Sequence, residues 1–246
     1  MIKQARALRQ KKARAESGLF LVEGIHHVGE AVEAGWDVQS LLYAPELLTS
    51  KFAEELISRL GDKPQPVSAE IMESLADKDN PQGILAVVHQ RQTKFSASLL
   101  LQTAVALVSP QDPGNVGTII RTMDAVGVDV LFLLDGGVDL YHPTVIRSSM
   151  GAIFSKPVVS ASFDEFLAWA RAGKFQLVAT SAHADAGYRT FAPITPWILV
   201  LGSEQKGLSP EQMQACDVAV SLPMQGRVSS LNLAVAAGVL LYSLKQ

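Results

Sequence analysis

The sequence predicts an α/β protein with a mostly parallel sheet, preceded by a smaller α/β domain. Three observations lead to this prediction. Short apolar runs of strand character alternate with segments that carry apolar residues at helical spacing, which is typical of a parallel sheet covered by helices. A polar, mixed stretch at 90–98 interrupts this alternation. Apolar residues make up 48% of the 246 residues, so both parts can build a core.

The first part, 1–95, is predicted to be a compact α/β domain. Its expected strands are 19–22, 38–43 and 83–89, and its expected helices are 23–34, 52–60 and a short one around 71–75. Gly35 and Gly61 follow the first two helices and end them, because glycine adopts helix-terminating conformations without strain. We interpret 90–98 as a linker.

The second part, 96–246, restarts the alternation. Its expected strands are 104–108, 129–134, one near 157–159, 175–180, 197–201 and 218–221, and its expected helices are 116–126, 143–150, 163–172, 210–215 and 230–244. Ser209, Pro210 and Gln212 form a helix start with a serine cap and a proline in the first turn. Ser229 or Ser230 is expected to cap the last helix.

Composition excludes several classes of protein. No apolar run reaches the ~18 residues of a membrane span, and the basic N-terminus lacks the apolar region of a secretory signal. The single cysteine, Cys216, excludes an internal disulfide and a cysteine-based zinc site. We expect a cytoplasmic protein with no membrane partner. Metal-ligand spacing is also lacking among His26, His27, His89 and His183, so no metal site is predicted.

The charge is unevenly distributed. The net charge is −3, yet residues 1–14 carry six basic residues and no acid. The remaining chain holds 15 basic and 24 acidic residues. A basic arm on an acidic body is typical of a protein that meets a polyanion with one region. A merely solvated N-terminus fits the charge pattern equally well.

Three polar, turn-rich segments each follow an apolar strand and lead into a helix. They are 111–121 (QDPGNVGTIIR), 201–208 (LGSEQKGL) and 222–232 (LPMQGRVSSLN). Loops of this kind at strand ends build the ligand pockets of α/β proteins. In this order they resemble the signature motifs of the SpoU/TrmH branch of the SPOUT methyltransferases. The resemblance covers most of 104–246, and the agreement of three spaced motifs makes it specific.

The resemblance implies a fold, a reaction and partners. The fold is a knotted SPOUT domain, with a C-terminal trefoil knot that holds S-adenosylmethionine (AdoMet). The reaction is AdoMet-dependent methylation of a ribose 2′-oxygen in structured RNA, by a homodimer whose active site lies near the subunit interface. The first domain resembles a small substrate-binding domain related to RNA-binding ribosomal proteins, with its best match at 20–24. It favours ribosomal RNA over tRNA, and DNA is not an expected partner.

The same resemblance implies which residues form the site. The implied catalytic residues are Arg121, Asn115, Glu204, Ser230 and Asn232, and the implied cofactor-binding residues are Gly202, Leu222, Met224 and Leu231. Alternative interpretations are a solvated Arg121, an Asn115 that only caps its helix, and a solvated Glu204 in the loop. Gly202 is expected to permit a sharp turn at the end of its strand.

Arg121 is expected to act as a fixed charge. It lies opposite the apolar stripe of its predicted helix. Because arginine stays protonated in proteins, it is a poor general base. We expect it to hold the target phosphate and to stabilise the developing alkoxide, with a phosphate oxygen or water as the proton acceptor.

Four basic residues are candidates for RNA contact. They are Arg9, Lys11 and Lys12 in the basic arm, and Arg147 in the segment 141–151, which also resembles a family segment. A structural ion pair is the alternative for Arg147. At the level of function, the alternatives are a tRNA methyltransferase, a non-catalytic RNA-binding protein that keeps the fold, and a methyltransferase that acts on something other than RNA.

Overall fold

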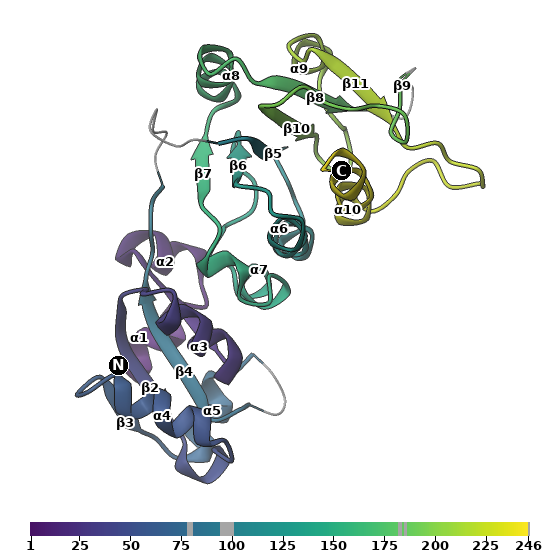
Figure 1. The fold of residues 1–246 in the computed structure, drawn as a ribbon. Helices are drawn as coiled ribbons and strands as arrows, with labels where there is room; N and C mark the ends of the chain where they lie inside the picture. Colours follow the sequence, from purple (N-terminus) through teal and green to yellow (C-terminus); the bar gives the residue numbers. More distant parts are fainter. Residues whose placement is uncertain (78–80, 94–100, 182–183, 185, 246) are drawn as a thin grey trace. The chain divides into compact units, whose positions relative to one another are not determined.

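The computed structural model describes residues 1–77, 81–93, 101–181, 184 and 186–245. By contacts, the chain divides into two compact units (Figure 1). Unit 1 contains Met1–Arg91 and Asp139–Ser155, and unit 2 contains 92–138 and 156–246. The predicted domain boundary, part of the predicted linker and His183 lie outside the described residues. Among the described residues, no helix is both long and apolar enough to cross a membrane.

Unit 1 is built on a four-stranded sheet in the order β1-β4-β2-β3. Its strands are β1 (Leu19–Glu23), β2 (Val38–Tyr43), β3 (Pro64–Pro66) and β4 (Ile84–His89). β4 pairs antiparallel with both β1 and β2, and β3 adds in parallel at the edge. The sequence pattern predicted the three long strands. It missed β3, whose two prolines disfavour a strand everywhere except at a sheet edge.

Five helices of unit 1 come from its N-terminal part. They are α1 (Ile2–Ala7), α2 (Lys11–Ser17), α3 (Ile25–Glu33), α4 (Lys51–Arg59) and α5 (Ala69–Leu75), with a short 3-10 turn η1 (Pro45–Leu47). The last three helices were predicted. α1 and α2 were not, because helices of only 6 and 7 residues carry little apolar periodicity. Ala5 and Leu8 of the arm are buried in the core of unit 1, so hydrophobic burial holds the arm in place.

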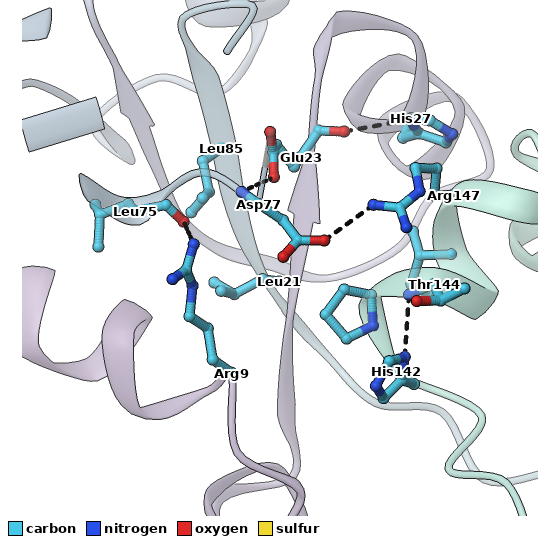
Figure 2. Close-up of a pocket in the computed structure, with 12 residues that line it drawn as sticks. Arg9, Leu21, Glu23, His27, Leu75, Asp77, Leu85, His142, Thr144 and Arg147 are labelled. Atoms are coloured by element: carbon cyan, nitrogen blue, oxygen red, sulfur yellow. Dashed lines mark hydrogen bonds and ion pairs between the residues drawn. The ribbon is translucent and has the colours of Figure 1, made fainter. Parts of the chain in front are cut away.

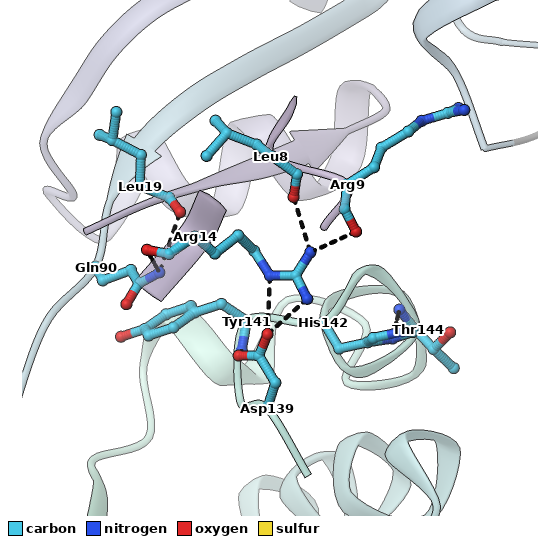
Figure 3. A network of polar contacts seen from close by, with 9 residues as sticks. All are labelled: Leu8, Arg9, Arg14, Leu19, Gln90, Asp139, Tyr141, His142 and Thr144. Carbon is cyan, nitrogen blue, oxygen red and sulfur yellow. Dashed lines mark hydrogen bonds and ion pairs between the residues drawn. The ribbon is translucent and has the colours of Figure 1, made fainter. Parts of the chain in front are cut away.

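A buried arginine joins the basic arm to the segment 139–155 (Figure 3). Arg14 is only 2% exposed. Its guanidinium donates to the Asp139 carboxylate at 2.6 and 2.8 Å and to the backbone oxygens of Leu8 and Arg9 at 2.8 Å each. Four charge-assisted contacts compensate for the loss of hydration of this charge. Arg14 therefore has a structural role and is not available to a polyanion.

The segment 139–155 contains α7 (Pro143–Ser148) and the 3-10 turn η2 (Ala152–Phe154). The predicted helix ran to 150, but α7 ends at Ser148 because Met150 and Gly151 adopt positive φ angles of 51° and 92°. The indole of Trp36 donates to the backbone oxygen of Phe154 at 2.9 Å. Together with the Arg14 contact, this explains why the segment belongs to unit 1.

Unit 2 contains a seven-stranded sheet in the order β7-β6-β5-β10-β8-β11-β9, with every pair parallel. Its strands are β5 (Thr103–Val108), β6 (Val130–Leu134), β7 (Val158–Ala161), β8 (Gln176–Thr180), β9 (Ala186–Gly187), β10 (Trp197–Leu201) and β11 (Val218–Ser221). The predicted parallel sheet is confirmed. Only β9 was missed, since two residues carry no periodicity.

Helices cover both faces of this sheet. They are α6 (Pro113–Val126), α8 (Phe163–Ala172), α9 (Pro210–Gln214) and α10 (Leu233–Leu244). On one face, Phe132 of β6 packs against Phe166 and Trp169 of α8, with ring centroids 5.2 and 5.0 Å apart. α6 and α10 pack against each other. A Cβ at Gly238 would lie 3.9 Å from the Thr122 methyl group, which is an ordinary contact, so this approach does not require glycine at that position.

The pairing of β5 with β10 determines where the site forms. Val105 lies opposite Leu199, and Leu107 lies opposite Leu201. Parallel strands in register end at the same edge of a sheet, so the loops that follow β5 and β10 meet there. The first two of the three motifs recognised in the sequence are these loops.

Candidate active site

The first motif begins with an aspartate cap. Asp112 is the N-cap of α6, and its Oδ1 accepts from the backbone N–H groups of Gly114 at 2.6 Å and Asn115 at 3.3 Å. Pro113 occupies the first turn. The alternative that Asn115 caps this helix is therefore wrong. Asn115 lies in the first turn, only 7% exposed, and its side-chain amide is free to bridge other loops.

The three motifs are joined by a chain of side-chain hydrogen bonds. Asn115 donates from Nδ2 to Oε1 of Glu204 at 3.0 Å. Asn232 donates from Nδ2 to Oδ1 of Asn115 at 2.9 Å. The residues are 89 and 117 positions apart in the chain. Each amide uses both its donor and its acceptor side, which fixes the orientation of the Asn115 side chain.

Asn232 has a second role, as the N-cap of α10. Its Oδ1 accepts from the backbone N–H groups of Ala234 at 2.9 Å and Val235 at 3.3 Å. The prediction that Ser229 or Ser230 caps this helix is wrong. The serines precede the helix by too many residues for their side chains to reach its first N–H groups, whereas asparagine is among the best capping residues.

Glu204 connects the second motif to the first. Its carboxylate accepts from the backbone N–H groups of Gln111 at 3.0 Å and Asp112 at 3.2 Å, in addition to the Asn115 amide. Partial burial raises the pKa of Glu204, but the hydrogen bonds from Asn115 and from backbone N–H groups outweigh it, and the net pKa lies below the ordinary value. Glu204 is therefore ionised at neutral pH and is a weak proton acceptor. Its geometry is that of an anchor between loops.

Gly202 lies where two stretches of backbone pass in close contact. A Cβ built on Gly202 would lie 2.0 Å from the carbonyl carbon of Gly207 and 2.3 Å from the nitrogen of Leu208. Gly202 does not adopt a positive φ. The sequence-based expectation that Gly202 permits a sharp turn is therefore wrong. Glycine is needed here because the neighbouring backbone leaves no space for a side chain. Gly207 closes the loop by donating from its N–H to the oxygen of Ser203 at 2.9 Å.

Two adjoining cavities lie among these loops. The larger, about 910 Å³, is lined by Asn115, Gly202, Glu204 and Asn232, among others. The smaller, about 160 Å³, is lined largely by apolar groups and includes Leu222 and Met224. Ser230 and Leu231 line both cavities. Eight of the nine predicted catalytic and cofactor residues are thus brought together in one region.

Arg121 is the exception. It lies on α6, is exposed, and lines neither cavity. Within the part of the chain that the structure describes, its guanidinium has no hydrogen-bond or ion-pair partner. Its predicted position opposite the apolar stripe of the helix is confirmed, because Val116, Ile119 and Ile120 are fully buried.

The candidate RNA contacts lie in unit 1. Arg9 donates to the backbone oxygens of Leu75 and Ala76, and Arg147 forms an ion pair with Asp77 at 2.9 Å. Lys11 and Lys12 are exposed on α2. Arg9 and Arg147 therefore have structural contacts, yet both also line a cavity of unit 1 (Figure 2).

Sequence reasoning missed Thr180 and Gln111, which also belong to this region. Thr180 ends β8 and lines both cavities. The available signal was a polar residue at the carboxyl end of an apolar strand. Among the described residues no group of His, Cys, Asp or Glu side chains has a metal-binding arrangement. Burial raises the pKa of the Cys216 thiol to about 11, so this cysteine is an unreactive packing residue.

Comparisons with known proteins point to one family. The sequence model of the SpoU rRNA Methylase family matches residues 102–242, and that of the MRM3-like substrate binding domain matches residues 1–86. The chain is 34% identical to the 23S rRNA (uridine(2479)-2′-O)-methyltransferase of Streptomyces viridochromogenes, over 96% of this chain and 85% of that protein. It is 31% identical to the 23S rRNA (guanosine(2553)-2′-O)-methyltransferase RlmP of Bacillus subtilis, over 99% and 95%.

Solved structures give the same answer. The crystal structure of the SpoU methyltransferase AviRb from Streptomyces viridochromogenes in complex with AdoMet matches with a TM-score of 0.90 and 33% identity, covering 98% of this chain and 95% of that one. The AdoMet-bound rRNA methyltransferase from Sinorhizobium meliloti matches with a TM-score of 0.88 and 33% identity, covering 98% and 92%.

Proposed function

Because the chain belongs to the SpoU rRNA Methylase family, we propose that it transfers the methyl group of AdoMet to a ribose 2′-oxygen of ribosomal RNA. The observation that carries this proposal is the hydrogen-bonded chain Asn232–Asn115–Glu204 beside two adjoining cavities. We favour ribosomal RNA over tRNA as the substrate because two relatives that match nearly the whole chain are named 23S rRNA methyltransferases.

The cavities fit AdoMet. The smaller, largely apolar cavity suits the adenine ring, with Leu222, Met224 and Leu231 as its contacts. The larger cavity suits the polar remainder of the cofactor and the incoming ribose. Gly202 lines this cavity, and its lack of a side chain lets the backbone of Gly207 and Leu208 fold back against it. When bound, AdoMet supplies the electrophilic methyl group.

The residues of the chain have the following roles. The ionised Glu204 and the two asparagines hold the three loops in the geometry that forms the cavities. Arg121 holds a phosphate of the target nucleotide and stabilises the negative charge that develops on the ribose oxygen. The ribose hydroxyl loses its proton to a phosphate oxygen or to water, since Glu204 is a weak base and arginine does not titrate in this range.

A homodimer is part of the proposal. α10 carries three exposed apolar side chains, Val235 (52%), Val239 (37%) and Tyr242 (61%), at i, i+4 and i+7. They form one stripe on the helix that also packs against α6, where Arg121 lies. Arg121 lines neither cavity of its own chain. We therefore propose that it completes the site of a second copy.

Two features of the loops around the cavities support a proposed trefoil knot. The segments that follow β10 and β11 both line the larger cavity, although β8 separates these strands in the sheet. Backbone also passes backbone closely at Gly202. Both features are compatible with loops that thread through each other.

Methyl transfer to ribosomal RNA with radiolabelled AdoMet, followed by mapping of the modified nucleotide, tests the reaction. We expect Arg121→Ala to keep the fold and AdoMet binding but to lose transfer by about 100- to 1,000-fold. Full transfer by a folded Arg121→Ala protein would exclude the proposed role of Arg121. Absence of AdoMet binding by calorimetry would exclude the enzyme and favour a non-catalytic RNA-binding protein.

A subunit-mixing experiment tests the shared site. Arg121→Ala and Asn115→Ala chains are each expected to be inactive alone. If the arginine acts across the interface, co-expression of the two restores about a quarter of the activity, because half of randomly formed dimers are mixed and each of these has one intact site. If each chain uses its own Arg121, both sites of every mixed dimer lack either Arg121 or Asn115, and co-expression restores no activity. Crosslinking of a Tyr242→Cys variant with a bifunctional thiol reagent measures the interface independently. A crosslinked dimer is expected if α10 of one copy packs against α10 of the other.

A further inference from the structure

Unit 1 contains a cavity that has no part in the methyl-transfer site. Its volume is about 250 Å³ (Figure 2). Leu21 and Glu23 of β1, Leu85 of β4 and Leu75 at the end of α5 form one side. Residues of α7, including Thr144 and Arg147, form the other. The cavity is therefore built from both parts of the chain that make up unit 1.

The charges around this cavity balance. Arg9 and Arg147 face Glu23 and Asp77, with Arg147 and Asp77 paired at 2.9 Å. Two carboxylates disfavour a phosphate as the occupant, and two guanidinium groups disfavour a cation. The side chains of Leu21, Leu75 and Leu85 supply apolar surface. The matching ligand is neutral, with apolar faces and a polar edge.

The hydrogen-bonding groups specify that edge further. Oε2 of Glu23 accepts from the backbone N–H of Asp77 at 2.8 Å. Its Oε1 is buried and has no hydrogen-bond partner among the described residues. A buried acceptor without a donor is unfavourable, so an incoming N–H group is its complement. Arg9 uses only Nη2 for its two backbone contacts, which leaves further N–H groups of its five for a carbonyl oxygen.

The ligand therefore needs an N–H group for Glu23 and an adjacent carbonyl oxygen for Arg9. Among the RNA bases, uracil and guanine have such a ring N–H beside a carbonyl group. The cavity is smaller than the ~300 to 1,000 Å³ of sites for larger ligands, and it suits a single base. Arg6 donates at 3.0 Å to Ser74, which directly precedes the cavity residue Leu75. Exposed Lys11 and Lys12 add positive charge on α2 for flanking phosphates.

We propose that the cavity of unit 1 binds one unpaired uracil or guanine base of the RNA substrate, out of its stack, while Arg6, Lys11 and Lys12 contact the adjoining phosphates. This inference rests on the proposed function, because it takes RNA to be the substrate. It assigns to unit 1 a base-reading role that is separate from methyl transfer in unit 2.

Binding of short single strands to the full-length protein tests the proposal. The probes are a uridine hexamer, a cytidine hexamer, an abasic hexamer of the same charge, and uridine monophosphate. We expect the uridine hexamer to bind about 10-fold more tightly than the abasic or cytidine hexamer. Equal binding of the uridine and abasic hexamers would overturn the base pocket. Binding of the monophosphate as tight as that of the hexamer would overturn the assignment to RNA and indicate a free nucleotide.

Two variants localise the effect. Glu23→Gln replaces the acceptor without changing its shape and is expected to abolish the preference for uridine over cytidine. Thr144→Tyr fills the cavity and is expected to remove the preference over the abasic strand. Glu55→Gln, an exposed glutamate of α4, is the matched control and is expected to bind as the unmodified protein does. A Thr144→Tyr protein that is folded and keeps the preference would contradict the proposal.

The two proposals fail in different ways. AdoMet titration and methyl transfer to ribosomal RNA by the unmodified protein test the proposed function alone. If they succeed while the hexamers show no base preference, only the base pocket is wrong. If the protein neither binds AdoMet nor methylates RNA, the proposed function is wrong whatever the hexamers show.

Discussion

Replacing Gly202 with alanine tests whether the cofactor loop depends on close backbone contact. The new Cβ would lie 2.0 Å from the carbonyl carbon of Gly207, whereas ordinary contacts begin near 3.4 Å. Residues 207 and 208 must therefore retreat by about 1.4 Å, the difference between these two distances. Both are backbone, so no side-chain rotation relieves the overlap. Overpacking of this kind costs about 1 to 3 kcal/mol.

The cost is expected to appear mainly in cofactor binding. A loop that moves away relieves the strain in the free protein, and AdoMet binding must then reverse the movement. The same free energy corresponds to a fall in AdoMet affinity of about 5- to 150-fold. Isothermal titration calorimetry measures this directly, and urea unfolding measures any loss of stability in parallel.

Gly226→Ala is the matched control. Gly226 lies in the loop 222–232, and a Cβ there meets nothing within 4 Å. We expect its AdoMet affinity and urea midpoint to equal those of the unmodified protein. The reasoning is refuted if Gly202→Ala binds AdoMet with unchanged affinity, or if Gly226→Ala loses as much affinity as Gly202→Ala does.

Three further predictions concern the polar networks. Asn115→Asp places a carboxylate against Glu204, whose Oε1 now lies 3.0 Å from the Asn115 amide nitrogen. We expect transfer activity to fall at least about 100-fold at neutral pH and to recover partly in mildly acidic buffer, where the two carboxylates take up a shared proton. A pH–activity profile without this recovery would contradict the assignment. The folded-state pKa of Glu204 lies below its ordinary value of 4.5, so the ionised carboxylate stabilises the fold fully above that value, and this stabilisation is lost as the pH falls through the folded pKa. Urea unfolding should therefore show a stability difference between the unmodified protein and Glu204→Gln that shrinks on acidification. A difference that stays constant with pH would exclude this linkage. Arg14→Met leaves the Asp139 carboxylate without its partner and should destabilise the protein by about 3 to 5 kcal/mol. The control Lys12→Met removes only an exposed ion pair with Glu16 and should change stability by less than about 1 kcal/mol. Similar urea midpoints for the two variants would show that burial of Arg14 is unimportant.

Local sequence patterns were sufficient for most elements of the sheet. The apolar run at 197–201 and the capping residues Ser209 and Gln212 predicted β10 and the start of α9, and both are confirmed. These features depend on neighbours within a few residues, through side-chain burial and satisfaction of the first N–H groups of a helix. Short or weakly periodic elements such as α1 and β9 were missed because they gain their stability from contacts with distant residues, which local patterns do not contain.

The motifs themselves could be recognised in the sequence, but not how they are joined. Local patterns suggested that Asn115 could cap a helix and that Glu204 could be solvated, and a serine was expected to cap α10. In the structure Asp112 and Asn232 are the caps, and Asn115 bridges the two other motifs. Capping is a competition among several polar residues near a helix start, and the outcome depends on which other partners the fold brings within hydrogen-bonding distance.

By itself, then, the sequence determined the alternation of strands and helices, the family motifs and the list of candidate site residues. Only the tertiary structure decided that Arg14 is a buried anchor for Asp139, that Gly202 is required by an adjoining backbone, and that residues 89 and 117 positions apart share hydrogen bonds. The physical reason is the order of strands in the sheet. Parallel pairing of β5 with β10 brings the loops that follow them to one edge of the sheet. Local periodicity along the chain does not reveal which strands pair.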